Sequence, residues 1–239
     1  MLRDRHKARR EWAILMAGAV LAPPAGLQAQ VPDSIPAVTI RDAVSAGVAS
    51  VLLVTPRAVG WGTGLPDCAP CDRADVPAFD RWAISRYKGT WHWASNVGVV
   101  ALAGLVTADL ALRRDGARTV AALEAGLWAA GLTEVLKAAV GRPRPVLYTV
   151  DAAAAAGSAG SARSFPSGHT AVAFALATTY WLAREDLDGK PGVLGWLAFG
   201  VAAGVGVSRV AAAKHFPSDV LAGAVLGTAS GVVVYAIKF

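Results

Sequence analysis

Three groups of polar side chains stand out in a mainly apolar sequence, and their residue types suit the binding and transfer of a phosphoryl group. The first group is cationic and consists of Lys137, Arg144 and Arg209. Cations repel one another at short range, so three of them are best accommodated around an anion with several oxygens, and the guanidinium fork of arginine matches phosphate geometry. If the chain brings these cations together, they predict a phosphate site.

The second group is the run 164–169 (SFPSGH), which leads into an apolar stretch. The first backbone N–H groups of a helix have no partner within the helix and lie at the positive end of its dipole, so they bind anions. Gly168 has no side chain and allows the backbone to come close to a ligand. A helix that begins here would direct its N–H groups to the same phosphate as the cations.

The third group contains the residues that could form and break bonds to phosphorus, namely His169, His215 and Asp219. His215 and Asp219 are four positions apart, so the carboxylate can reach one ring nitrogen and leave the other free as a nucleophile. We expect His215 to attack phosphorus, and His169 to protonate the leaving oxygen and then activate water. No metal site is predicted here, because lysine and arginine neutralise the phosphate and would repel a metal cation.

The spacing of these groups resembles the tripartite signature of the type 2 phosphatidic acid phosphatase (PAP2) superfamily. The signature runs Lys137, six residues, Arg144-Pro145; then 166–169 (PSGH); then Ser208-Arg209, five residues, His215, three residues, Asp219. Every fixed position is present, and the resemblance covers about residues 92–237. It implies an all-helical bundle that hydrolyses phosphomonoesters or pyrophosphates through a phosphohistidine.

The resemblance also implies a role for each matched residue. Phosphate would be bound by Lys137, Arg144, Ser167, Gly168, His169 and Arg209. In addition, His169 would be the general acid, His215 the nucleophile and Asp219 its partner. The superfamily also includes soluble acid phosphatases and vanadium haloperoxidases that share these residues, so the signature alone leaves the substrate open.

The composition indicates that these residues belong to a membrane protein. Hydrophobic residues make up 54% of the 239 residues and charged residues only 17%, whereas roughly a quarter of the residues in a soluble domain are charged. Stretches of about 17 to 22 apolar residues can cross a hydrocarbon core of about 30 Å. Such stretches are found at about 92–112, 119–140, 168–183, 192–210 and 217–237. The expected fold is all-α, a polytopic transmembrane helical bundle with five to six membrane helices.

The basic loop 113–118 (RRDGAR) orients this bundle, because short loops rich in lysine and arginine stay in the cytoplasm. The loops 61–91, 141–167 and 208–216 then face the periplasm. All three polar groups are therefore expected at the periplasmic ends of the helices.

The part of the chain before the resemblance divides into two regions. Residues 1–29 place basic residues ahead of an apolar run that ends in small residues, and we expect a signal peptide or an N-terminal signal anchor. Residues 30–91 are expected to form a periplasmic or interfacial region, followed by the phosphatase membrane domain at 92–239. For the stretch 43–60, we favour a helix on the periplasmic membrane face, with a spanning helix and a cytoplasmic N-terminus as the alternative.

Cys68 and Cys71 lie in the exported loop 61–91. A local disulfide is expected there, because exported segments meet an oxidising environment. A redox-active CxxC motif is not favoured, since no thioredoxin-like strand and helix pattern surrounds the pair.

Several further residues are expected to have structural roles. Small residues recur every four positions in two stretches, Gly200, Gly204 and Ser208, and then Gly223, Gly227 and Gly231. Because small residues let helix backbones approach closely in lipid, the last two helices are predicted to pack together. Glu134 lies three residues before Lys137 and could orient its ammonium group. His92 lies between two tryptophans and is assigned to an interfacial aromatic belt.

These features predict a membrane phosphatase whose active site faces the periplasm at the bacterial inner (cytoplasmic) membrane. The expected substrate is a lipid phosphate or pyrophosphate of the undecaprenyl pyrophosphate, phosphatidate or phosphatidylglycerol phosphate class, hydrolysed without metal or cofactor. A net charge of +6 is explained by this anionic substrate and the bilayer, with no nucleic acid partner, and the oligomeric state is left open. Two alternatives remain: a soluble periplasmic acid phosphatase of broad specificity, and a non-catalytic bundle that binds or transports anions.

Overall fold

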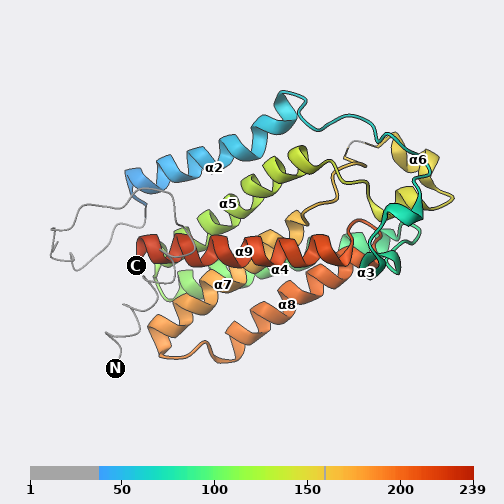
Figure 1. Ribbon diagram of the computed structural model, residues 1–239. Coiled ribbons are helices and arrows are strands. Elements are labelled where there is room, and N and C mark those ends of the chain that lie inside the picture. The colour runs from blue at the N-terminus through green and yellow to red at the C-terminus, as the bar shows by residue number, and fades with distance from the viewer. Residues whose placement is uncertain (1–37, 159) are drawn as a thin grey trace.

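The computed structural model describes residues 38–158 and 160–239, and every regular element in these ranges is helical. The long helices of the described part (Figure 1) are α2 (Ile40–Ala58), α4 (Gly89–Leu112), α5 (Gly116–Val140), α7 (Gly168–Asp188), α8 (Gly192–Ala211) and α9 (Pro217–Lys238). The short elements are α3 (Ala78–Arg81), α6 (Ala152–Ala156) and the 3-10 turns Arg73–Asp75 and Pro145–Tyr148. The all-α prediction is confirmed, whereas the predicted signal segment 1–29 lies outside the described residues.

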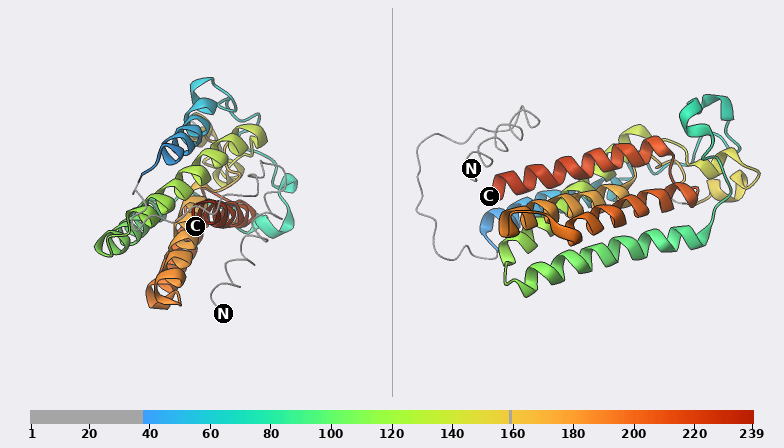
Figure 2. Two further views of the ribbon diagram at one scale, coloured as in Figure 1. Left: turned by 90° about the vertical axis from the view of Figure 1, so that its left-hand side faces the viewer. Right: turned by 90° about the horizontal axis from the view of Figure 1, so that it is seen from below.

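Within the described part of the chain, four helical stretches are long and apolar enough to cross a membrane. They are α4, the stretch Gly116–Tyr148 that contains α5, α8 and α9. The fifth predicted stretch forms α7, which does not meet the same criterion. α7 contacts α4, α5, α8 and α9, and many of its residues are buried; Figure 2 shows the bundle of these helices from two further sides. A helix surrounded by protein does not need a uniformly apolar surface.

Local sequence signals end and start helices beside the signature residues. α5 ends at Gly141, whose φ of 63° is in the left-handed region that favours glycine. Arg142 and Arg144 follow in the connection directly after α5. α9 begins at Pro217, which has no N–H to leave unpaired in the first turn. His215 therefore lies in the connection just before a helix.

The glycines of α9 pack its backbone directly against α7. A Cβ atom at Gly223 would lie 2.5 Å from the carbonyl oxygen of Ser167, and one at Gly227 would overlap the carbonyl oxygen of Ala171. By contrast, Gly200 and Gly204 on α8 have nothing within 4 Å of a Cβ position. α8 and α9 contact each other as predicted, but the α9 stripe makes its closest backbone approach to α7, and Gly200 and Gly204 of the α8 stripe face open space.

α2 runs beside α5 along the bundle (Figure 1). Near its start, Asp42 pairs with Lys238 at the end of α9, with 2.8 Å between Oδ1 and Nζ. Near its end, Arg57 pairs with Glu134 on α5, with 3.0 Å between Nη1 and Oε2. These contacts hold α2 alongside the long helices of the bundle. This direction agrees with the alternative of a spanning helix, but α2 is not among the four stretches of the described chain that are long and apolar enough to cross a membrane, so its position relative to the membrane stays a prediction.

Three connections meet at one end of the bundle, at the right in Figure 1. They are the segments 59–88, 141–167 and 212–216. Cys68 and Cys71 are joined by a disulfide in the first of these, and the N–H of Cys71 donates to the carbonyl oxygen of Leu147 at 2.9 Å. Phe216 packs into the same apolar cluster as Cys71 and Leu147. This end of the molecule therefore holds the connection that carries His215.

Candidate active site

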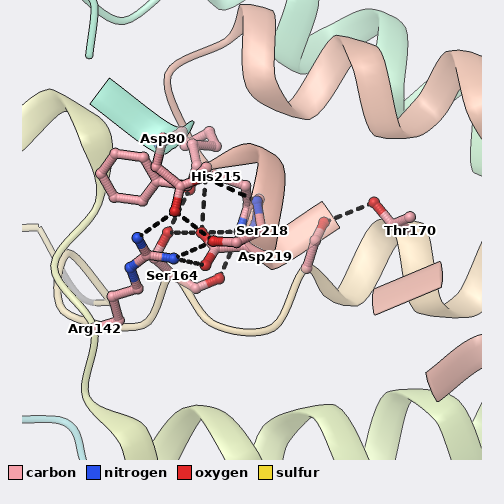
Figure 3. A network of polar contacts seen from close by, with 10 residues as sticks. Asp80, Arg142, Ser164, Thr170, His215, Ser218 and Asp219 are labelled. Carbon is pink, nitrogen blue, oxygen red and sulfur yellow. Dashed lines mark hydrogen bonds and ion pairs between the residues drawn. The ribbon is translucent and has the colours of Figure 1, made fainter. Parts of the chain in front are cut away.

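His215 is buried, with 1% of its surface exposed. Its Nδ1 lies 2.6 Å from the carbonyl oxygen of Ser164 (Figure 3). A carbonyl oxygen can only accept, so Nδ1 carries the proton and Nε2 is left with a free lone pair. Asp219 was expected to hold this ring nitrogen, but its Oδ2 is 3.7 Å away, and the carbonyl of Ser164 is the nearer partner.

Asp219 is held by donors on three sides. Its Oδ2 accepts from the hydroxyl of Ser164 at 2.5 Å and from the N–H of Phe216 at 2.8 Å. Its Oδ1 accepts from Nη1 of Arg142 at 2.6 Å. The carboxylate is thus fixed behind the protonated nitrogen of His215, where it can compensate a positive charge that develops on the ring.

The protonation state of His215 follows from its surroundings. Burial, with smaller effects of Arg209 and Arg144, lowers the pKa of the ring from 6.5 to about 3, although Asp219 acts in the opposite direction. Burial disfavours the charged form of a histidine, and nearby cations do the same. At neutral pH the ring is therefore uncharged, which is the form that can act as a nucleophile.

His169 lies in the first turn of α7 and is oriented by a residue of α4. Its Nε2 is 2.7 Å from Oδ1 of Asn96. An amide oxygen accepts, so Nε2 of His169 donates and Nδ1 remains for another partner. No sequence signal marked Asn96, because it lies in a helix outside the signature.

Arg209 is held by the same helix. Its Nη1 lies 2.7 Å from Nδ1 of His92 and 3.0 Å from the hydroxyl of Ser95. The His92 ring is also 6.5 Å from the His169 ring, centroid to centroid. The assignment of His92 to an aromatic belt therefore overlooked its main contact, which is with a signature arginine.

Lys137 is buried at the opposite wall of the site. Its Nζ is 3.1 Å from Oε1 of Glu134 and would be 3.3 Å from a Cβ atom at Gly168. Glu134 also pairs with Arg163 through Oε2 at 2.9 Å. The expected contact of Glu134 with Lys137 is present, and the missing side chain at Gly168 makes room for the ammonium at the start of α7. Ser167 is buried, and its hydroxyl shares a hydrogen bond of 2.8 Å with Thr170.

Two signature arginines and a neighbouring lysine stand apart from the acidic residues of the described chain. Within the described residues, no carboxylate oxygen lies within 4.0 Å of Arg144, Arg209 or Lys214. The Nε atoms of Arg144 and Arg209 are buried with no hydrogen-bond partner among these residues. The charges of Lys137, Arg144 and Arg209 act on both His169 and His215. Cations that converge in this way on two histidines can bind a phosphoryl group and neutralise it.

Three contributors to this site carried no predicted role. Asp80 and Asn96 come from the first 117 residues, and Arg142 lies between two signature positions. The sequence shows that Arg142 is a cation next to the signature. It does not show that Arg142 contacts Asp219, which lies 77 positions away. Such contacts are set by the packing of distant elements.

Comparisons with known proteins show the family of the chain. Residues 118–239, about half of the chain, match the PAP2 superfamily. A protein named lipid A 1-phosphatase from Porphyromonas gingivalis is 41% identical over 78 residues, which are 33% of this chain and 17% of that protein. A protein named bacitracin transport permease protein BcrC from Bacillus licheniformis is 38% identical over 72 residues, which are 30% of this chain and 32% of that protein. No solved structure matches the chain.

The aligned segments thus span less than a third of each relative's length. The family match, in contrast, contains the complete signature from Lys137 to Asp219 together with α5, α7, α8 and α9. Together with its apolar helices, it makes the chain a multi-pass membrane protein. By this match and by its signature residues, the chain belongs to the PAP2 superfamily.

Proposed function

We propose that this protein is a phosphatase that hydrolyses a lipid phosphate or lipid diphosphate at the periplasmic face of the bacterial inner membrane. The observation that carries the proposal is the environment of His215. The ring is buried and neutral, its Nε2 is free, and Arg144 and Arg209 beside it have no carboxylate partner within the described residues. A neutral imidazole among unpaired arginines suits attack on a phosphoryl group.

In the proposed reaction, the Nε2 lone pair of His215 attacks phosphorus, and the bond from phosphorus to the ester or bridging oxygen breaks. Burial and the nearby cations disfavour a charged His169 in the free protein, and the bound anionic phosphate offsets these cations. In the substrate complex His169 is then the imidazolium: one N–H donates to Asn96, and the other gives its proton to the leaving oxygen. His215 becomes positively charged in this step, and Asp219 compensates the charge. Neutral His169 then takes a proton from water, whose oxygen attacks phosphorus. The N–P bond breaks, and phosphate is released.

A lipid substrate is supported by the apolar helices and by the relatives. Helices long enough to cross a membrane end where the site lies, so a headgroup at the bilayer surface would meet the cations. One relative is named a phosphatase of lipid A. We propose a lipid of the undecaprenyl pyrophosphate, phosphatidate or phosphatidylglycerol phosphate class. A panel of these lipids, ranked by kcat/KM with detergent-purified protein in EDTA, identifies the preferred one.

The first test is replacement of the nucleophile. His215→Ala should lower turnover of a lipid phosphate by at least about 10³-fold, because no other group can form the covalent intermediate. Incubation with lipid carrying a ³²P-labelled phosphate, followed by an alkaline quench, should label the wild-type protein and leave His215→Ala unlabelled. His6→Ala is the matched histidine control and should retain both label and turnover. Wild-type turnover in His215→Ala would overturn the mechanism.

The same experiment separates the two alternatives. The name of the Bacillus licheniformis relative includes transport, and a non-catalytic transport bundle would bind lipid phosphate without label or phosphate release. A soluble phosphatase of broad specificity would be recovered without detergent. Extraction in detergent, together with a labelled histidine, supports the proposed membrane phosphatase over both.

A further inference from the structure

Asp80 is a buried carboxylate in a part of the chain that has no role in the proposed reaction. It lies in the short helix α3 and is 1% exposed. Its Oδ1 accepts from the N–H of Ser218 at 3.0 Å, and its Oδ2 accepts from the Ser218 hydroxyl at 2.5 Å (Figure 3). The partners are 138 positions apart. Asp80 therefore ties the segment between α2 and α4 to the first turn of α9, directly before Asp219.

Arg142 joins Asp80 to Asp219. Its Nη2 donates to Oδ2 of Asp80 at 2.8 Å, while its Nη1 donates to Oδ1 of Asp219 at 2.6 Å. The guanidinium also lies over the ring of Phe216, 4.2 Å from its centroid. Arg142 thus divides its two terminal nitrogens between two buried carboxylates.

This division matters because an arginine can bind one carboxylate with both nitrogens. Because Nη2 of Arg142 donates to Asp80, only Nη1 is left for Asp219, and it binds only Oδ1 of that carboxylate. The other oxygen of Asp219 stays with Ser164 and Phe216, on the side of His215. Without Asp80, the guanidinium would be free to turn onto both oxygens of Asp219 and to neutralise the charge that His215 needs.

We propose that Asp80 is a positioning residue for the nucleophile, acting through Arg142 and Ser218 on Asp219. It keeps Arg142 from binding Asp219 with both nitrogens, and it holds the first turn of α9, which follows His215. The inference rests on the proposed function, because it concerns the charge that forms on His215 during attack. The positioning role of Asp80 gives a function to the connection 59–88, which carries the disulfide and lies outside the PAP2 match.

The test compares Asp80→Asn, Arg142→Gln and the double variant with wild-type protein. Asp80→Asn should lower kcat for a lipid phosphate about 10- to 100-fold, because a misplacement of catalytic groups by about 1 Å can cost about 100-fold in rate. KM should change by less than about twofold, because Asp80 does not touch the substrate. If Asp80 acts through Arg142, the double variant should be no slower than Arg142→Gln alone. Asp75→Asn, an exposed aspartate of the same segment, is the matched control and should match wild type.

Two outcomes would overturn the inference: wild-type kcat in Asp80→Asn, or losses that multiply in the double variant. If Asp80→Asn does not fold, Ser218→Ala keeps the carboxylate and removes a hydroxyl that donates to Asp80 and accepts from Nη1 of Arg142 at 2.7 Å. It should lower kcat several-fold with KM unchanged. Unchanged kcat in Ser218→Ala would then refute the positioning role. Failure of the wild-type protein to form a labelled histidine would instead refute the proposed function, so the two failures are distinguishable.

Discussion

His215 shows how the fold changes the chemistry of a single residue. The ring is uncharged over a wide pH range because burial lowers its pKa to about 3, whereas an unfolded histidine titrates near 6.5. Between these two values the unfolded chain binds a proton that the folded chain does not. Protonation therefore favours the unfolded state, and this residue makes the protein less stable as pH falls through that window.

We expect His215 to remain neutral well below pH 6.5, since the folded protein disfavours the charged ring. Histidine NMR on ¹⁵N-labelled protein in detergent, with the His215→Ala variant to assign the signal, should show no titration of this ring near pH 6.5. The acid limit of phosphohistidine formation should accordingly not come from His215 at that pH. A His215 signal that titrates with an ordinary histidine pKa would contradict the burial argument.

At the scale of elements, the contact between α7 and α9 aligns two parts of the signature. His169 lies on α7 and Asp219 on α9, and the N–H of Ser167 donates to the carbonyl oxygen of Asp219 at 2.9 Å. The close approach of the backbones depends on Gly223 and Gly227. The spacing of catalytic residues is therefore sensitive to the volume of side chains in this contact.

A methyl group at Gly227 has no room, because its Cβ would overlap the carbonyl oxygen of Ala171. Gly227→Ala should destabilise the protein by about 1 to 3 kcal/mol, as overpacking does, and should lower kcat by shifting α9 against α7. Gly200→Ala is the matched control, since nothing lies within 4 Å of its Cβ position. There the higher helix propensity of alanine should leave the Tm equal or higher. Equal Tm values for the two variants in detergent would refute this packing argument.

At the scale of the whole molecule, basic residues gather at both ends of the bundle, and they differ in their acidic partners. One end holds the site cations, with Arg144, Arg209 and Lys214 left without a carboxylate partner among the described residues. The other end holds the turn between α4 and α5, where Arg113 pairs with Asp109 and Asp188. A basic turn is typical of the cytoplasmic side. The cations of the site lie at the opposite end, where this preference predicts few lysines and arginines. A bound phosphate that neutralises them would explain their presence there.

The position of α2 predicts on which side the chain enters it. Val38 lies at the end of the bundle opposite the site, next to the pair of Asp42 with Lys238, whereas Lys88 lies at the site end. If α2 crosses the membrane, a membrane-impermeant thiol reagent should label Lys88→Cys in intact cells and Val38→Cys only after permeabilisation. Both native cysteines are in a disulfide, so the wild-type chain is the unreactive control. Labelling of both variants in intact cells would contradict a crossing helix.

The sequence by itself determined which residues could do chemistry and that long apolar helices would hold them. Both follow from local properties: each residue type brings the same functional group to any fold, and the period and length of an apolar stretch are visible in a single segment. The signature positions on α5, α7, α8 and α9 and the family were accordingly predictable, and Lys137 does contact Glu134 three residues away.

Only the tertiary structure decided which groups hold those residues in place. The carbonyl of Ser164 is the partner of His215, Asn96 orients His169, His92 binds Arg209, and Arg142 bridges Asp80 and Asp219. These partners are 51 to 117 positions apart. Tertiary packing likewise decided that α2 lies beside α5 and that the glycines of α9 face α7. A contact between distant segments depends on how whole helices pack, and no local pattern in either segment specifies its partner.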